Sequence, residues 1–86
     1  MNILKLYDRF SKAKFAMRAF ADSNPSCIVS GKDMKVVLYN GTVVMFGSIE
    51  NGDDYRRYAS LEIQCLEVNG DIPEEVISFM KTRIRG

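Results

Sequence analysis

The first twenty residues contain the longest regular spacing of apolar side chains in the sequence, and this spacing limits what the rest of the chain can form. Apolar residues recur every three or four positions, namely Ile3, Leu6, Phe10, Ala13, Met17 and Phe20. At about 100° per residue they share one side of a helix. No Pro or Gly interrupts the run, and Phe15 falls outside the apolar stripe. The spacing therefore predicts a helix over residues 2–22, whose apolar side needs a sheet to lie on.

The pair Asn40-Gly41 gives the clearest local signal for a sheet. It separates two β-rich runs, residues 34–39 and 42–49. An Asn-Gly pair in this setting is typical of a two-residue hairpin with a type I′ turn. Such a turn fixes the register, so that Leu38 faces Val43 and Val36 faces Met45.

Three further segments complete the predicted fold. Residues 27–29 form a short strand, residues 55–66 alternate as a longer strand, and a second helix begins at Pro73, followed by Glu74 and Glu75. We expect one α+β domain over residues 1–86 with the order α-β-β-β-β-α. Its sheet is an antiparallel meander of three to four strands, with the N- and C-terminal helices packed on one face.

Composition narrows the class of protein further. The chain is 47% hydrophobic and 27% charged, which is typical of a folded domain. Its apolar runs are too short to span a bilayer, and its first residues lack the pattern of a secretion signal. We therefore expect a cytoplasmic protein without membrane contact, in which Cys27 and Cys65 are reduced and buried.

The charges are segregated along the chain. Residues 1–22 carry five basic and two acidic side chains, a balance of +3, whereas residues 47–75 carry eight acids and two arginines, a balance of −6. Clustered Lys and Arg on a helix can contact the phosphates of a nucleic acid. The candidate nucleic-acid-binding residues are Lys5, Arg9, Lys12, Lys14 and Arg18. The alternative is an ordinary solvated helix face.

The face of the sheet turned away from the helices keeps more apolar and aromatic residues than solvation requires. Its candidate interface residues are Val37, Tyr39, Val44, Phe46, Arg56 and Tyr58. An apolar patch rimmed with charge is typical of a protein contact, here most simply a homodimer. Cross-strand stabilisation without a partner is one alternative. Stacking of RNA bases on the aromatic side chains is another, although the aromatic motifs of RNA-recognition modules are absent.

The sequence offers little for catalysis. It contains no histidine, the residue most used for proton transfer near neutral pH. The acidic pairs Asp53-Asp54 and Glu74-Glu75 are adjacent and fit a turn and a helix start. The two cysteines do not form a zinc site without histidine, and the glycines do not spell a phosphate-binding loop. We expect no catalytic residue, metal, cofactor or small-molecule substrate, and hence no enzyme.

The short length, the lysine-rich opening MNILKLYDRFSKAKF and the lack of an enzyme motif resemble small accessory proteins of T-even-like tailed phages. Such host-takeover or counter-defence proteins are often single α+β domains. The resemblance implies a binding protein that inhibits a host factor, such as a defence nuclease or toxin, in the host cytoplasm. Its partners would be a host protein or RNA. The alternative is a nucleic-acid-binding protein that uses the basic N-terminal helix.

Overall fold

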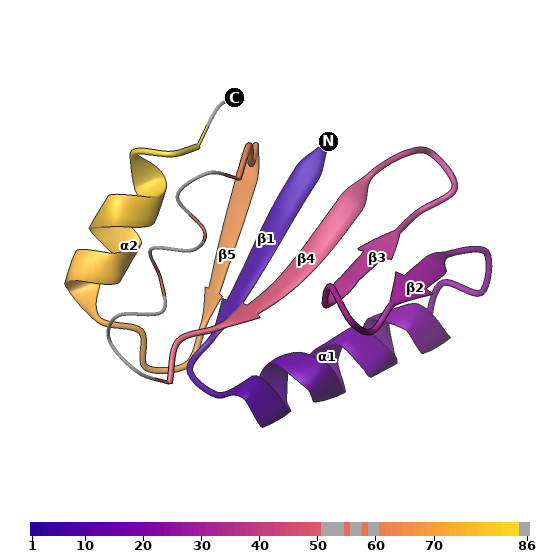
Figure 1. The fold of residues 1–86 in the computed structure, drawn as a ribbon, viewed down its shortest axis with the longest axis horizontal. Coiled ribbons are helices and arrows are strands. Elements are labelled where there is room, and N and C mark those ends of the chain that lie inside the picture. Colours follow the sequence, from indigo (N-terminus) through magenta and orange to yellow (C-terminus); the bar gives the residue numbers. More distant parts are fainter. Residues whose placement is uncertain (51–54, 56–57, 59–60, 85–86) are drawn as a thin grey trace.

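The computed structural model describes residues 1–50, 55, 58 and 61–84, and within them the chain forms one mixed sheet with two helices (Figure 1). The strand order is β2-β3-β4-β1-β5. The elements follow the chain as β1 (Asn2–Tyr7), α1 (Phe10–Asp22), β2 (Ile28–Ser30), β3 (Lys35–Val37), β4 (Val43–Ser48), β5 (Cys65–Asn69) and α2 (Glu74–Lys81). The α+β class is therefore confirmed.

The N-terminal segment is a strand, and the helix predicted over residues 2–22 is correct only from Phe10 onward. β1 lies between β4 and β5 and is parallel to both, so that neighbours bond its backbone on each edge. Leu4 and Leu6 alternate with partly exposed residues and are fully buried. In α1 the predicted stripe holds for Ala13, Met17 and Phe20, which lie in or against the core cluster, whereas Phe10 is 48% exposed.

The predicted antiparallel meander is wrong, because the sheet is mixed. Only β2, β3 and β4 are antiparallel neighbours, whereas β1 joins β4 and β5 in parallel. Instead of a strand over residues 55–66, the structure places β5 at Cys65–Asn69. Tyr55 and Tyr58 lie outside any strand, and residues 56, 57, 59 and 60 of that predicted strand lie outside the described residues.

The two helices pack on opposite sides of the sheet rather than on one. Ile3 is in register with Val44, so that the next residue, Leu4, points to the other side. One core cluster joins α1 to the side that bears Val44 and consists of Ala13, Met17, Val36, Val44 and Phe46. A second joins α2 to the side that bears Leu4, and its members include Leu4, Leu6, Val76 and Met80. Figure 1 shows α1 running along β4, β3 and β2, and α2 standing beside β5.

The hairpin between β3 and β4 forms as predicted, but its register differs by one residue. Val36 is in register with Val44, and Val37 with Val43. The loop is three residues long, since the Leu38 N–H donates to the Thr42 carbonyl (2.8 Å), and within it only Gly41 has a positive φ, of 89°. A type I′ turn would require a positive φ at Asn40 as well. This one-residue shift turns every side chain of β4 to the side opposite the predicted one.

Replacing Gly41 with valine is expected to lower the free energy of unfolding by about 1–3 kcal/mol, because a β-branched residue is strained at positive φ. No neighbouring atom lies within 4 Å of the added Cβ, so the cost is conformational alone. Urea denaturation measures the change. The matched control is Gly31→Val, at an equally open turn position without positive φ, and an equal loss in both variants would contradict the assigned turn.

The C-terminal helix follows the prediction closely, while the cysteines follow it only in part. Pro73 precedes α2, and Glu74 and Glu75 occupy its first turn, where negative charge is favourable. Cys27 and Cys65 are unpaired. However, Cys27 is only partly buried and Cys65 is exposed, so the prediction that both are buried is wrong for Cys65. Cys65 is in register with Ile3 and therefore lies on the side of the sheet that faces away from α2.

Candidate interaction surfaces

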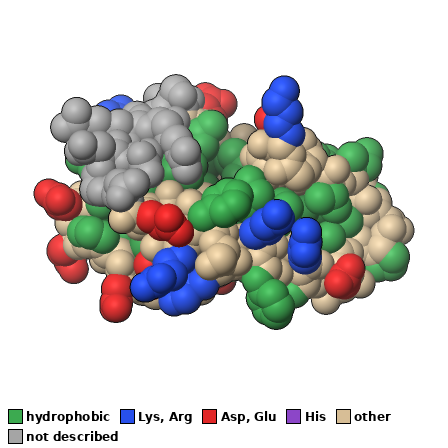
Figure 2. Space-filling model, turned by 60° about the horizontal axis from the view of Figure 1, so that its bottom comes forward, with side chains coloured by type: hydrophobic (Ala, Val, Ile, Leu, Met, Phe, Trp, Pro, Cys, Tyr) green, Lys and Arg blue, Asp and Glu red, His purple; other side chains and the backbone are tan. Residues whose placement is uncertain are grey.

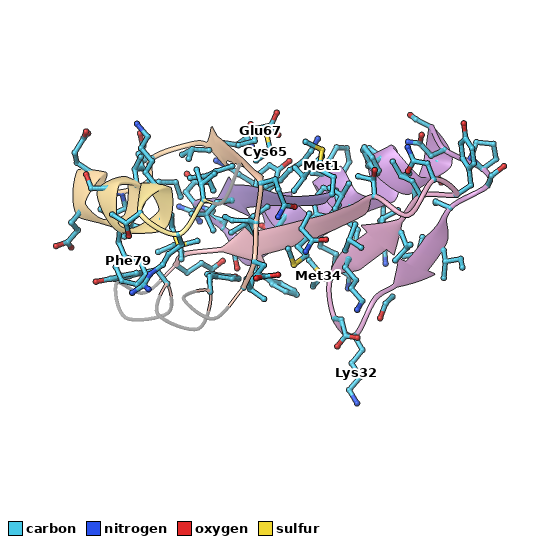
Figure 3. All side chains as sticks on the ribbon, turned by 90° about the horizontal axis from the view of Figure 1, so that it is seen from above. Met1, Lys32, Met34, Cys65, Glu67 and Phe79 are labelled. Atoms are coloured by element: carbon cyan, nitrogen blue, oxygen red, sulfur yellow. The ribbon has the colours of Figure 1, made fainter. Side chains whose placement is uncertain are left out.

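Part of the sheet is left without a helix on one side. Ile28, Val37 and Val43 are in register across β2, β3 and β4, and Met45 lies two residues further along β4 on the same side. We call these four residues the open face. α1 lies on the other side of these strands, and Figure 3 shows no described helix over this one. Ile28 is 71% exposed, and the other three are partly exposed. The open face is thus a largely apolar surface that the described chain leaves partly in contact with water. Met45 packs at the edge of the core cluster of α2, and Lys35 lies beside it in register on the same side.

The open face ends in a cavity of about 400 Å³ at the carboxyl end of β4. The last hydrogen bond from β4 to the β3 segment is donated by the Phe46 N–H to the Met34 carbonyl (2.8 Å). Two residues further along β4, the Ser48 N–H donates instead to the Tyr58 hydroxyl (3.1 Å). The Tyr58 hydroxyl thus takes the place of a strand partner. Most of the lining is apolar, and the residues are Phe10, Lys32, Asp33, Met34, Met45, Phe46, Ser48, Tyr58 and Leu61.

The cavity has the size and polarity to receive an apolar side chain. Apolar pockets of a few hundred cubic ångströms with few polar groups are typical of binding sites. Methionine side chains, of which it has two, adapt to varied partners. Figure 3 shows Lys32 extending away from the rest of the molecule, so its charge lies at the rim. Met34 has a positive φ of 52°, unusual for a residue with a side chain, at the point where β3 separates from β4.

The predicted interface residues are dispersed by the structure. Val44 and Phe46 are buried under α1, because the one-residue shift in register turns them to that side. Tyr58 is buried in the other core cluster. Val37 belongs to the open face, and Tyr39 is 88% exposed in the hairpin turn. Arg56 lies outside the described residues. The prediction that these residues share one exposed surface is therefore wrong for Val44, Phe46 and Tyr58.

Two of the five predicted basic residues have charged partners within the chain. Lys5 lies in β1 and not on a helix, with its Nζ 5.1 Å from the ring centre of Phe20 and 5.9 Å from that of Phe46. The same Nζ lies 3.5 Å from a Glu67 carboxylate oxygen. Lys12 lies 3.0 Å from the Asp8 carboxylate. Both charges are therefore balanced by acidic side chains.

The other three basic residues, Arg9, Lys14 and Arg18, are exposed. None of them has an ion pair within the part of the chain that the structure describes. Arg9 precedes α1, and Lys14 and Arg18 lie one helical turn apart within it. Phe15, beside Lys14, is 75% exposed, as its position outside the apolar stripe predicted. The structure thus keeps three of the five predicted basic residues available on or beside α1.

The Asp8 carboxylate ties the end of β1 to the loop before α2. Besides Lys12, it accepts a hydrogen bond from the Asp71 N–H (3.3 Å). These contacts, with that of Lys12 the largest, hold the pKa of Asp8 below its ordinary value of 3.8. Nearby, burial and the negative charge of Glu67 raise the pKa of Tyr7. Both shifts are explained by contacts within the fold.

The described residues contain neither a metal-binding cluster nor a membrane-spanning helix. Among them, no cluster of three or more His, Cys, Asp or Glu side chains is arranged to hold a metal ion. None of the described helices has the length and apolar character needed to cross a membrane. Comparisons with protein-family models, curated proteins and solved structures found no match to this chain.

Proposed function

We propose that the protein is a non-enzymatic binding protein that forms a homodimer through its open face. The observation that carries this proposal is the row Ile28–Val37–Val43, which no helix of the described chain covers, on strands whose other side is covered by α1. Layered α+β domains cover the apolar side of a sheet, and contiguous exposed apolar groups mark contact sites. Among the six interface residues predicted from the sequence, Val37 belongs to this surface.

A second copy is supported by two features of the open face, an exposed apolar side chain and a cavity. Ile28 is 71% exposed at the β2 end, and the cavity lies at the β4 end beside Met45. A two-fold axis between them brings Ile28 of each copy toward the cavity of the other, as in isologous interfaces. The rim carries both charge signs, Lys32 beside Asp33, so that opposite charges can face each other across the axis.

The dimer leaves other surfaces free for a further target. α1 and its basic residues lie on the opposite side of the sheet from the open face. Inhibition of a host factor, which the resemblance to phage accessory proteins implies, stays a prediction. It is compatible with a dimer that displays two copies of α1.

Sedimentation equilibrium at micromolar concentrations tests the proposal. We expect a dimer for the natural chain and a monomer for Ile28→Glu, since a charge in the interface would face an apolar cavity. The matched control is Phe15→Glu, which places the same charge at an equally exposed apolar residue on α1 and is expected to stay dimeric. A monomeric natural chain would overturn the proposal, as would a dimer that tolerates Ile28→Glu but dissociates with Phe15→Glu.

A further inference from the structure

The outward side of α1 combines exposed positive charge with an exposed aromatic ring. Lys14, Phe15 and Arg18 share it at spacings of one, three and four residues, and Arg9 precedes the helix. We call Lys14, Phe15 and Arg18 the α1 outer surface. The buried side of α1 is formed by Ala13 and Met17, so the α1 outer surface is not needed for packing on the sheet. Figure 2 shows Lys and Arg side chains next to hydrophobic ones over α1, and acidic side chains gathered toward α2.

Among the described residues, the cations of this surface form no ion pair. Asp8, the acid nearest to α1 in sequence before it, already holds Lys12. Glu50 approaches the start of the helix, but its carboxylate accepts the Phe10 N–H (2.7 Å) and so occupies the helix terminus. Within α1 the single acid is Asp22, which lies one turn beyond Arg18 on the same side, and no ion pair joins the two in the described structure. A polyanion would therefore meet unpaired cations here.

Phe15 gives the surface a second kind of contact. Its ring is 75% exposed, and its neighbours one turn before and after are the small residues Ser11 and Ala19. Small neighbours leave the flat side of the ring accessible. Exposed aromatic rings next to Lys and Arg are how proteins hold unpaired nucleotides, because each base stacks on a ring while its phosphate meets a cation.

We infer that the α1 outer surface binds single-stranded nucleic acid, with Lys14 and Arg18 at the phosphates and a base stacked on Phe15. A duplex is the poorer ligand because its bases are already stacked and cannot cover the ring. Neither contact reads the 2′-hydroxyl group or a base edge, so DNA and RNA strands of any sequence bind alike. This inference is independent of the proposed homodimer, whose interface lies on the other side of the sheet.

Fluorescence anisotropy with a labelled oligothymidylate tests the inference at low and moderate salt. Phe15→Ala is expected to weaken binding of the oligonucleotide roughly tenfold, the effect of one lost stacking contact. It is expected to leave binding to heparin, a polyanion without bases, unchanged. The double variant Lys14→Gln/Arg18→Gln is expected to weaken both ligands and to lower the slope of log affinity against log salt by about 1.4 for the oligonucleotide.

The matched control is Lys81→Gln, an exposed lysine in the last turn of α2, which is expected to leave both affinities unchanged. Oligouridylate of the same length is expected to bind as tightly as oligothymidylate, and duplex DNA more weakly. The inference is overturned by no binding of the oligonucleotide at low salt, or by tighter binding of duplex DNA. Equal loss of heparin and oligonucleotide binding in Phe15→Ala would equally overturn it, since stacking would then play no part.

Discussion

Gly47→Ala is expected to destabilise the protein by about 3 kcal/mol, because the site has no room for a methyl group. A Cβ at Gly47 would lie 2.6 Å from the Tyr58 hydroxyl oxygen and 2.7 Å from the ring carbon that bears it. The Tyr58 ring is buried among core residues, so moving it away from the added methyl group would disrupt its packing. Its displacement would also remove the acceptor of the Ser48 N–H. Chemical denaturation measures the loss as a lower midpoint.

Two comparisons separate this collision from a general cost of adding a side chain. Gly31→Ala adds the same methyl group in open space and is expected to change stability by less than about 0.5 kcal/mol. In a Tyr58→Ala background the further change Gly47→Ala is expected to cost much less than in the natural chain, because the colliding ring is gone. Full additivity of the two changes would contradict the assigned contact, and so would an unchanged midpoint in Gly47→Ala.

The elements whose signals are local were predictable from the sequence. The position of the hairpin around Gly41, though not its loop length, depends on residues close in the sequence, and so do the helix from Phe10 to Asp22 and the helix after Pro73. β1 was not predictable in this way. Residues 2–7 fit a helical stripe through Ile3 and Leu6, and equally an alternation through Leu4 and Leu6. The strand is selected by partners about 40 and 60 residues away, which no local pattern reveals.

The candidate interface shows how a small error in register changes a predicted surface. With a two-residue turn, Val44 and Phe46 face away from the helices, and with the observed three-residue loop they face α1. Because side chains alternate along a strand, a shift by one residue exchanges the two sides of β4. The prediction of an uncovered sheet face assumed that both helices lie on the other side, whereas in the structure they lie on opposite sides, and the partly exposed residues of β4 on the side away from α1 are Val43 and Met45.

Some of the predicted basic residues could be placed from the local sequence, whereas others depend on contacts with distant segments. Exposure of Lys14 and Arg18 follows from helical periodicity alone, so the sequence was sufficient to place them. Lys5 meets Glu67 and two phenylalanines only because β1 is the central parallel strand. The carboxylate at the start of α1 also comes from afar, since Glu50 lies 40 residues beyond Phe10. Such contacts depend on topology and were beyond the reach of sequence reasoning.

Gly70→Ala is expected to lower the free energy of unfolding by about 3 kcal/mol, for two reasons that act together. Gly70 has a φ of +88°, which strains any side chain, and its added Cβ would lie 2.6 Å from Cγ of Asp8. The control Gly41→Ala has nearly the same φ, +89°, but no atom within 4 Å of the added Cβ. The difference between the two variants therefore isolates the collision with Asp8.

The pH dependence of stability gives this prediction a second readout. The pKa of Asp8 in the folded chain lies below its ordinary value of 3.8, chiefly because of Lys12 and also because of the Asp71 N–H. A carboxyl group with a lowered folded pKa stabilises the fold fully above its unfolded pKa, and this contribution is lost as the pH falls through the folded value. Gly70→Ala displaces the Asp8 carboxylate from the Asp71 N–H. The free energy of unfolding of this variant is therefore expected to fall less than that of the natural chain as the pH drops below about 4.

Asp8→Asn distinguishes the titration of Asp8 from the rest of the acid-induced loss of stability. It removes the titrating group and keeps Gly70, so we expect its stability to fall less steeply below about pH 4 than that of the natural chain. Denaturation midpoints measured across this pH range for the natural chain and both variants make the comparison. If Gly70→Ala kept both the neutral-pH stability and the acid profile of the natural chain, the close packing of Asp8 on Gly70 would be refuted. Asp8 would then not tie β1 to the loop before α2.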